Sequence, residues 1–299
     1  METASVRDQA DGLRNLMRQT QEVRRTRPSS GEAARVITIC SGKGGVGKTS
    51  VTLSLAYAMM QRGARVLVLD ADLGMANVEV LLGTSSPDNL LHVIRGTKRL
   101  RDVVVEGPRG LRWISGGSGV AELADLTAEQ LHSLVASFGE LDATTDILLI
   151  DTGAGISRTV VSFIQAADEA IVVCTPEPTS ITDAYGVIKT VSSGERQIPL
   201  SLLINRAVND REAIDVGRGV QRAARRFLNR EVGVLGHLPE DPLVARAVRA
   251  QQPFFLMQPS ARVSRSVDQV AAKLIHQEQE GVRPKGLGAF IKRFASFFE

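Results

Sequence analysis

Residues 42–49 are Gly42-Lys43-Gly44-Gly45-Val46-Gly47-Lys48-Thr49, and they match the pattern G-x-x-x-x-G-K-[ST]. A Val/Ile-rich run precedes them and an apolar pattern with helical spacing follows them. This is the setting of a phosphate-binding loop between a strand and a helix. The glycines permit a tight turn whose backbone N–H groups point at phosphate oxygens, and the N-terminus of the following helix adds a positive dipole.

Two side chains of this loop predict specific contacts. Lys48 places a positive charge near the outer phosphates, and Thr49 can place its hydroxyl on Mg²⁺. We therefore expect the loop to bind ATP and Mg²⁺ and to support hydrolysis of ATP. The nucleotide-contacting residues expected from the loop are Gly44, Gly45, Val46, Gly47, Lys48, Thr49 and Ser50.

The regions around the loop alternate short β-branched runs with longer helical patterns. The apolar residues of the runs are nearly continuous, as in strands buried on both faces of a parallel sheet. This alternation predicts a doubly wound α/β fold, with a mostly parallel sheet flanked by helices and ligands at the carboxyl ends of the strands. The expected strands are Val36–Cys40, Arg65–Asp70, Leu111–Ser115, Ile147–Asp151, Ala170–Cys174, Leu200–Asn205 and Val232–Leu238. The helical patterns include Lys48–Arg62, Ala128–Leu141, Arg158–Ala166, Ile181–Ser192 and Val216–Leu228.

Composition narrows the class of protein. A chain of 299 residues is long enough for one large α/β domain, and its net charge of +3 is too small to indicate nucleic-acid binding by itself. The two cysteines, Cys40 and Cys174, end apolar runs and are expected to be buried strand residues, which fits a reducing cytoplasm. No stretch approaches the roughly 20 apolar residues of a membrane-spanning helix, and the N-terminus lacks the apolar region of a signal peptide.

Lys43 gives the loop a second lysine, which is the deviant Walker A signature. The chain here resembles the MinD/ParA family of P-loop ATPases. In that family the corresponding lysine reaches the nucleotide of a partner subunit. The resemblance implies an ATP-dependent homodimer with slow hydrolysis and Lys43 acting in trans. The alternative is a solvated loop lysine.

Three aspartates at expected strand ends complete a phosphoryl-transfer site. Asp70 and Asp72 are two positions apart and face the same way on an extended segment. By resemblance, Asp72 holds the attacking water and Asp70 lies near the Mg²⁺ shell or the loop lysine. Asp151 has the position of a Walker B aspartate, a ligand of Mg²⁺ through water. Gly153 stands where MinD proteins usually have proline, in a segment expected to sense the γ-phosphate. For any one of these aspartates alone, a helix N-cap is the commoner explanation.

Two later segments extend the resemblance. Asn205 and Arg206 end an expected strand, where family members hydrogen-bond the adenine. Pro239 and Asp241 lie in Gly236-His237-Leu238-Pro239-Glu240-Asp241-Pro242, which is similar to the family segment that closes over the base. Asparagine at a strand end is also a common turn residue.

The N-terminus contains Asp8-Gln9-Ala10-Asp11-Gly12-Leu13-Arg14, which resembles the D-Q-A-x-x-L-R motif of the FlhG (FleN, YlxH) branch, the MinD-like regulators of bacterial flagella. In that branch the segment binds and stimulates FlhF, a GTPase of the signal-recognition-particle type. The resemblance assigns partner binding to Asp8, Gln9, Ala10, Leu13 and Arg14. The apolar residues from Ala10 to Met17 share one helical face, as in a docking peptide. The alternative is a helix packed on its own domain.

The C-terminus has an apolar stripe at helical spacing, with basic residues beside it. Thirteen residues of helix measure about 20 Å, too short for roughly 30 Å of hydrocarbon, but such a helix can lie on an anionic membrane surface. Dimerisation joins two such tails and strengthens attachment. In the nucleotide-free monomer we expect the stripe to lie in a groove of the protein, because exposed phenylalanines aggregate. The stripe consists of Leu287, Phe290, Ile291, Phe294, Phe297 and Phe298.

These features divide the chain into a partner-activating segment and linker (1–30), a MinD-like ATPase domain (31–278) and a hinge with a membrane-targeting helix (279–299). The leading hypothesis is a regulator of flagellar number and placement, cytoplasmic and reversibly bound to the inner face of the cell membrane. Flagellar switch proteins or a flagellar transcription factor are further candidate partners.

The alternative is a ParA-type partition ATPase that binds DNA through an arginine-rich helix, but the Phe-rich tail favours a membrane. An iron–sulfur carrier is excluded by the lack of paired cysteine ligands. The arginines of that helix are Arg218, Arg222, Arg225, Arg226 and Arg230.

Overall fold

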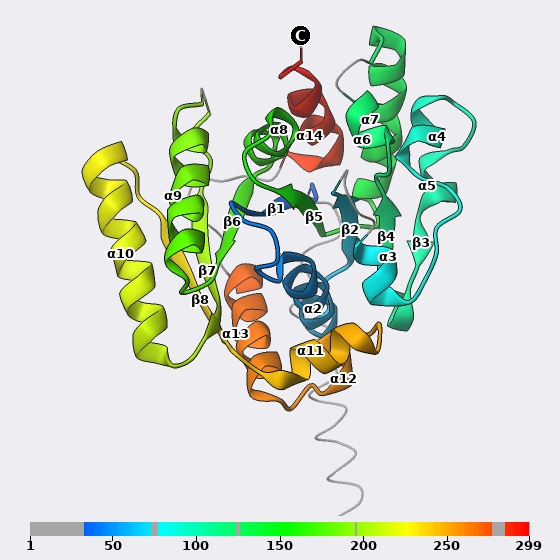
Figure 1. Cartoon of the computed structure of the whole chain (residues 1–299). Coiled ribbons are helices and arrows are strands. Elements are labelled where there is room, and N and C mark those ends of the chain that lie inside the picture. Colours follow the sequence, from blue (N-terminus) through cyan, green and yellow to red (C-terminus); the bar gives the residue numbers. More distant parts are fainter. Residues whose placement is uncertain (1–32, 73–76, 124–125, 195, 277–284, 299) are drawn as a thin grey trace, which may run out of the picture.

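A computed structural model of the chain describes residues 33–72, 77–123, 126–194, 196–276 and 285–298. Within these residues the chain forms one eight-stranded sheet with helices on both of its faces (Figure 1). The doubly wound, mostly parallel α/β fold predicted from the sequence is confirmed. The D-Q-A-x-x-L-R segment lies outside the described residues.

The strands follow the predicted runs closely, and their order in the sheet is β3-β4-β2-β5-β1-β6-β7-β8. All neighbouring strands are parallel except β3 and β4, which are antiparallel. The central strand β1 is followed by the glycine-rich loop, so the carboxyl ends of its neighbours surround that loop. The strands are β1 (Arg35–Ser41), β2 (Val66–Ala71), β3 (Val105–Glu106), β4 (Arg112–Ser115), β5 (Ile147–Ala154), β6 (Glu169–Cys174), β7 (Leu200–Ala207) and β8 (Gly233–Pro239).

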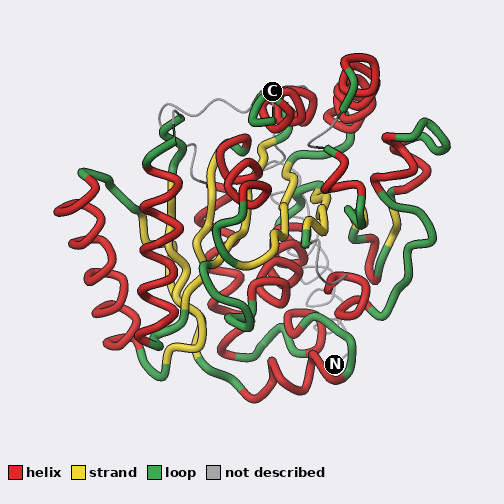
Figure 2. Tube along the Cα trace, turned by 45° about the horizontal axis from the view of Figure 1, so that its top comes forward, coloured by secondary structure: helices red, strands yellow, loops and turns green. Residues whose placement is uncertain are grey.

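Helices cover the two faces in separate layers, as Figures 1 and 2 show. One layer, containing α2, α3 and α11 to α13, packs on Ile37 and Ile39 of β1. The other, containing α4 to α10 and α14, packs on Val36 and Cys40 of the same strand. Successive strand residues point to opposite faces, which explains the continuous apolar runs. The helices are α2 (Lys48–Gln61), α3 (Asn77–Leu82), α4 (Leu90–Ile94), α5 (Leu100–Val103), α6 (Gly119–Glu122), α7 (Ala128–Asp142), α8 (Arg158–Ala166), α9 (Pro178–Ser192), α10 (Asp210–Leu228), α11 (Pro242–Arg249), α12 (Phe254–Met257), α13 (Arg262–His276) and α14 (Gly286–Ala295).

The C-terminal helix α14 lies on the body of the protein, against α7 and α8 (Figure 1). Leu287, Phe290, Ile291 and Phe294 are each 1% exposed or less. Phe294 packs on Phe163 of α8, with 4.4 Å between the ring centroids. The apolar stripe therefore completes a hydrophobic core in this structure, as expected for the monomer, and α14 is part of the folded domain in space.

Hydrogen bonds near both ends of α14 fix its position on the protein. At its start, the backbone N–H of Leu287 donates to Asp142, the last residue of α7, at 3.0 Å. At its end, Arg293 donates to the carbonyl of Ala166 at 2.6 Å and to Asp168 at 3.1 Å. These contacts fix one register of α14 in the groove, which apolar burial alone does not do.

Several bounds differ from the sequence prediction by a few residues, and two of the differences have a clear physical reason. The short antiparallel strand β3 was not predicted, because a run of two residues gives no periodicity. Helix α10 begins at Asp210 instead of Val216, because Asn209 caps it by accepting a hydrogen bond from the N–H of Glu212 at 2.9 Å.

Candidate nucleotide-binding site

The glycine-rich loop joins β1 to α2 in the way predicted. Gly47 is the N-cap of α2 and has a φ of 89°, in the left-handed region that favours glycine. A Cβ at this position would lie 2.6 Å from Nδ2 of Asn205, so only glycine fits there. The loop therefore presents its backbone and the N-terminus of α2 at the carboxyl edge of the sheet, as a phosphate-binding loop requires.

Asp151, on β5, is the centre of a buried polar cluster. It accepts a hydrogen bond from Thr49 at 2.6 Å and pairs with Lys48 at 3.4 Å. Thr49 contacts Oδ2 of Asp151, whereas Lys48 contacts Oδ1. The hydroxyl of Thr52, one turn further along α2, also lies 3.1 Å from Oδ1. Burial raises the pKa of Asp151 above its usual range, and Lys48 and the two hydroxyls oppose this rise. The predicted Walker B residue thus lies against both predicted phosphate and Mg²⁺ ligands of the loop.

Asp70 lies beside Asp151 in the sheet, in register on β2. Its side chain accepts hydrogen bonds from the N–H of Val78, in the first turn of α3, and from that of Asp72. Burial and the nearby Asp151 raise the pKa of Asp70 to about 7. Asp70 therefore accepts from the first turn of α3 without being its N-cap residue, and it also lies next to the predicted Mg²⁺ ligand.

Asp72 follows β2 and lies near the predicted γ-phosphate segment. Asn77 donates to its carboxylate at 3.2 Å. A Cβ at Gly153 would lie 3.4 Å from Asp72 Oδ1, so these two parts of the site are neighbours. The structure thus brings together the residue expected to hold the attacking water and the segment expected to sense the γ-phosphate.

Lys43 points away from the Asp151 cluster. Its Nζ donates to Glu177 at 2.9 Å and to Thr179 at 3.1 Å, at the start of α9. The Lys43 and Glu177 side chains are 40% and 56% exposed, which places this ion pair on the surface. The hydrogen bond to Lys43 lowers the pKa of Glu177. Lys43 is therefore neither bound within its own loop nor fully solvated.

The residues predicted to contact adenine lie at the ends of β7 and β8. Asn205 donates to the carbonyl of Val46 at 2.7 Å, so its amide braces the phosphate loop. Arg206 is exposed and has a φ of 57°, a strained value for a non-glycine residue that is common at binding sites. Pro239 ends β8, and Asp241 caps α11 by accepting from the N–H of Leu243 at 2.9 Å. β7 and β8 are paired neighbours, which groups these residues at one edge.

The donor set fits Mg²⁺. Thr49, Asp151 and Asp70 offer hydroxyl and carboxylate oxygens, the hard ligands that Mg²⁺ prefers. Among the described residues, no three His, Cys, Asp or Glu side chains form a group that could hold a metal ion. In a phosphoryl-transfer site Mg²⁺ takes one or two protein ligands, and substrate phosphates complete its shell.

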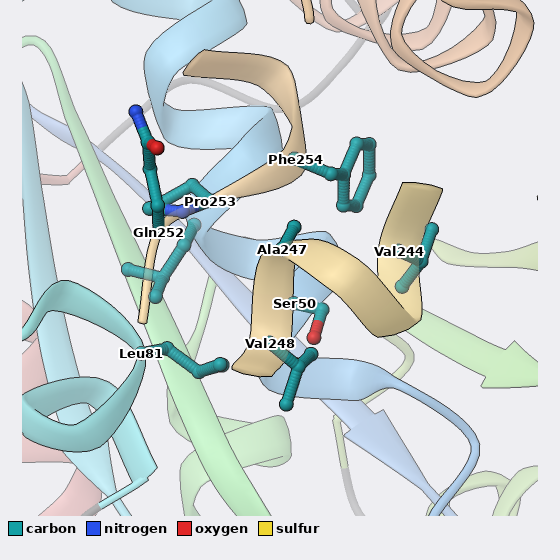
Figure 3. Close-up of a pocket in the computed structure, with 9 residues that line it drawn as sticks. Ser50, Leu81, Val244, Ala247, Val248, Gln252, Pro253 and Phe254 are labelled. Atoms are coloured by element: carbon teal, nitrogen blue, oxygen red, sulfur yellow. The ribbon is translucent and has the colours of Figure 1, made fainter. Parts of the chain in front are cut away.

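A small pocket lies between the first turns of α2 and helices α3, α11 and α12 (Figure 3). Ser50, a predicted nucleotide contact, is at its wall, together with Leu81 and Val248. The lining is apolar apart from Ser50 and Gln252, so it offers no charge to a phosphate group.

Sequence reasoning missed three residues of the site. Thr52 resembles any helical threonine in sequence, and only the packing of α2 on β5 places it at Asp151. Glu177 and Thr179 are more than 130 positions from Lys43 and follow a different strand. The residues of the C-terminal apolar stripe lie on α14 and in the turn that follows it, away from this site. Cys40 and Cys174 are buried as predicted, and burial raises the pKa of both thiols.

The site and the fold define a P-loop nucleoside triphosphatase. The sequence matches the ParA family, described as NUBPL iron-transfer P-loop NTPase, over residues 32–275. The chain belongs to this ParA/MinD family of P-loop NTPases.

Relatives and solved structures agree with this placement. The chain is 39% identical over 240 residues to the antiactivator FleN of Pseudomonas aeruginosa, covering 80% of this chain and 86% of FleN. It is 34% identical over 268 residues to the flagellum site-determining protein YlxH of Helicobacter pylori, covering 88% and 90% of the two chains. The septum site-determining protein MinD of Pyrococcus horikoshii, solved in complex with Mg-ADP, matches with a TM-score of 0.63 and 26% identity over 84% of this chain and 99% of MinD.

The raised pKa of Asp70 predicts that the free energy of unfolding of the nucleotide-free protein falls as pH rises. The folded protein holds this proton between about pH 4 and pH 7 while the unfolded chain releases it, so Asp70 lowers stability as pH rises through that window. Asp70→Asn should therefore raise the melting temperature at pH 8 and have little effect at pH 4, with a stability gain of at most about 4 kcal/mol. Thermal unfolding by circular dichroism measures this. An equal effect at both pH values would contradict it.

Proposed function

We propose that this protein is an ATP-dependent dimerising ATPase that acts as a spatial switch at the membrane and regulates flagellar number and placement. The observation that best supports the switch is the cluster around Asp151. In it, the two loop residues that serve phosphate and Mg²⁺ are both held by one buried carboxylate. Nucleotide binding must redirect both of them, and this changes the contacts of β5.

In hydrolysis, the loop backbone and Lys48 bind the β- and γ-phosphates and offset their charge. Thr49 and Asp151 would hold Mg²⁺, with Asp70 next to them, and the ion would stabilise the developing charge on the phosphate oxygens. Asp72 orients the attacking water. Its contacts with Asn77 and its closeness to Gly153 hold it beside the γ-phosphate segment.

The placement of Lys43 supports the proposed dimerisation. The lysine is held at the surface by Glu177 and Thr179 and is half exposed, so it is available to a second copy of the chain. In the dimer it leaves this ion pair and reaches the partner's nucleotide, whose negative charge replaces that of Glu177. An exposed ion pair contributes only about 0–1 kcal/mol, so its exchange costs little.

Membrane binding requires α14 to leave its groove. Its four buried apolar side chains stabilise the docked position by roughly 6–12 kcal/mol before ordering costs, so lipid must supply comparable burial. Arg158, the first residue of α8, donates to the carbonyl of Phe297 at 2.6 Å and lies over the ring of Phe298. The segment expected to sense the γ-phosphate, residues 152–155, ends three positions before Arg158. A shift of that segment would therefore weaken the hold on the turn that follows α14.

Arg293→Ala should increase vesicle binding in the absence of ATP, because it removes the hydrogen bonds to Ala166 and Asp168 that hold α14. A hydrogen bond with a charged group contributes about 1.5–3 kcal/mol, so the released fraction should rise about tenfold or more. Co-sedimentation with anionic vesicles measures this.

The matched control is Lys292→Ala, because Lys292 is exposed on the same helix and its loss removes the same charge from the lipid contact. Removal of 285–299 should abolish sedimentation of both variants. Equal ATP-free binding by the two point variants, or binding by the truncated protein, would refute the membrane helix.

The flagellar role rests on the similarity to FleN and YlxH and on the N-terminal motif. In a helix, the spacing of Ala10 and Leu13 would put them on one face with Arg14 beside them, and such a pattern suits docking to a folded partner. We propose an FlhF-type GTPase as that partner, stimulated by residues 8–14.

Deletion of residues 1–20 should leave the ATPase active and remove stimulation of an FlhF-type GTPase, measured by phosphate release from GTP. Leu13→Ala should reproduce the loss, because it truncates the apolar face of the segment. Arg24→Ala in the linker serves as the control and should stimulate like the intact protein. Normal stimulation by the deleted protein would show that the motif assignment is wrong.

A second candidate function is that of a DNA-binding partition ATPase. Helix α10 has a solvent-facing stripe of arginines, of which Arg225 pairs with Glu231 at 2.8 Å. Such a stripe suits a phosphate backbone. Salt-dependent DNA binding that survives removal of 285–299 would favour this function over membrane attachment. Arg230, which was predicted to belong to this helix, lies after its end and donates to Gln197 and to the carbonyl of Ile198 instead. The exposed arginines of α10 are Arg211, Arg218, Arg222, Arg225 and Arg226.

A further inference from the structure

Thr52 is fully buried on α2, one turn after the loop lysine. Its Oγ1 lies 3.0 Å from the carbonyl oxygen of Lys48 and 3.1 Å from Oδ1 of Asp151. A hydroxyl has one proton, so it donates to one of these two acceptors at a time. Donation to the carbonyl four positions back is the usual bond of a helical threonine. The second acceptor, a buried carboxylate, is unusual.

The importance of the contact between Thr52 and Asp151 depends on which other side chains donate hydrogen bonds to Asp151. Here Lys48 and Thr49 are its other partners. Both are the residues that turn to phosphate and Mg²⁺ when nucleotide binds, under the proposed function. Thr52 is not expected to contact the nucleotide, because it lies in α2, one turn beyond the loop. Once Lys48 and Thr49 have turned away, Asp151 would keep one protein donor out of the three.

We propose that Thr52 is a positioning residue for Mg²⁺ binding: its hydroxyl donates to Asp151 and fixes the orientation of that carboxylate when Lys48 and Thr49 serve the nucleotide. The charged carboxylate is a stronger acceptor than the Lys48 carbonyl, so the proton turns toward it. One oxygen of Asp151 is then occupied by Thr52, and the other, Oδ2, which Thr49 now contacts, faces the metal. This proposal rests on the proposed ATP and Mg²⁺ function.

The test is the affinity for a fluorescent ADP analogue, measured with Mg²⁺ and with EDTA, and the Mg²⁺ concentration that gives half of the effect. Thr52→Val keeps the shape and removes the hydroxyl. We expect it to lower the Mg²⁺-dependent gain in affinity about tenfold, the value of one hydrogen bond to a charged group. Affinity in EDTA should stay within about twofold of the unmodified protein, because the phosphate loop itself is unchanged.

Two variants serve as controls. Thr52→Ser restores the donor and should return the Mg²⁺ effect, although it lacks the methyl group. Ser54→Ala removes another fully buried hydroxyl of α2, one that has no hydrogen-bond partner among the described residues, and should change nothing.

A Thr52→Val protein with an unchanged Mg²⁺ effect would overturn the proposal. So would one that loses affinity equally with Mg²⁺ and EDTA, because that pattern indicates a purely structural role. Failure of the unmodified protein to bind the ADP analogue under either condition would instead refute the proposed function.

Discussion

The buried carboxylate of Asp151 is the constraint on which the site depends. It is fully enclosed, and burial raises its pKa because it disfavours the charged form, so that form depends on donors within hydrogen-bond distance. Lys48, Thr49 and Thr52 provide them, and all three come from the first two turns of α2. The contact thus joins the glycine-rich loop to the neighbouring strand β5. A ligand that attracts Lys48 and Thr49 would therefore remove two of the three donors to this carboxylate on β5.

Strand β5 connects the Asp151 cluster to the helical layer that contains α8 and α14, on the opposite face of the sheet from α2. After Asp151 the chain passes through Gly155, whose N–H donates to the carbonyl of Ser41 at 2.8 Å, just before the glycine-rich loop. It then enters α8 at Arg158, which donates to the carbonyl of Phe297 in the turn after α14. Further along α8, Phe163 packs on Phe294. Few residues separate the phosphate site from the helix proposed to bind lipid, and all of them lie on one continuous segment.

The fold and the centre of the site were predictable from sequence because they depend on local patterns. Buried strands gave continuous apolar runs, and the glycine spacing located the loop. Contacts between distant segments were not predictable in the same way. Nothing in the sequence pairs Lys43 with Glu177, or Thr52 with Asp151, because both contacts depend on strand order and register. The apolar face of α14 was evident, but its position was not, because the same stripe suits a lipid surface and a groove between α7 and α8.

The central claim is that ATP joins two copies of this chain through a shared nucleotide site. The most direct measurement is the molar mass in solution, by light scattering, of Asp72→Ala with ATP, with ADP and without nucleotide. Because the proposed role of Asp72 is to orient the water and not to bind the phosphates, this variant should bind ATP, fail to hydrolyse it, and form a stable dimer with ATP alone. A second substitution, Lys43→Ala, should return that ATP-bound variant to a monomer. A monomeric Asp72→Ala protein with bound ATP would contradict the account.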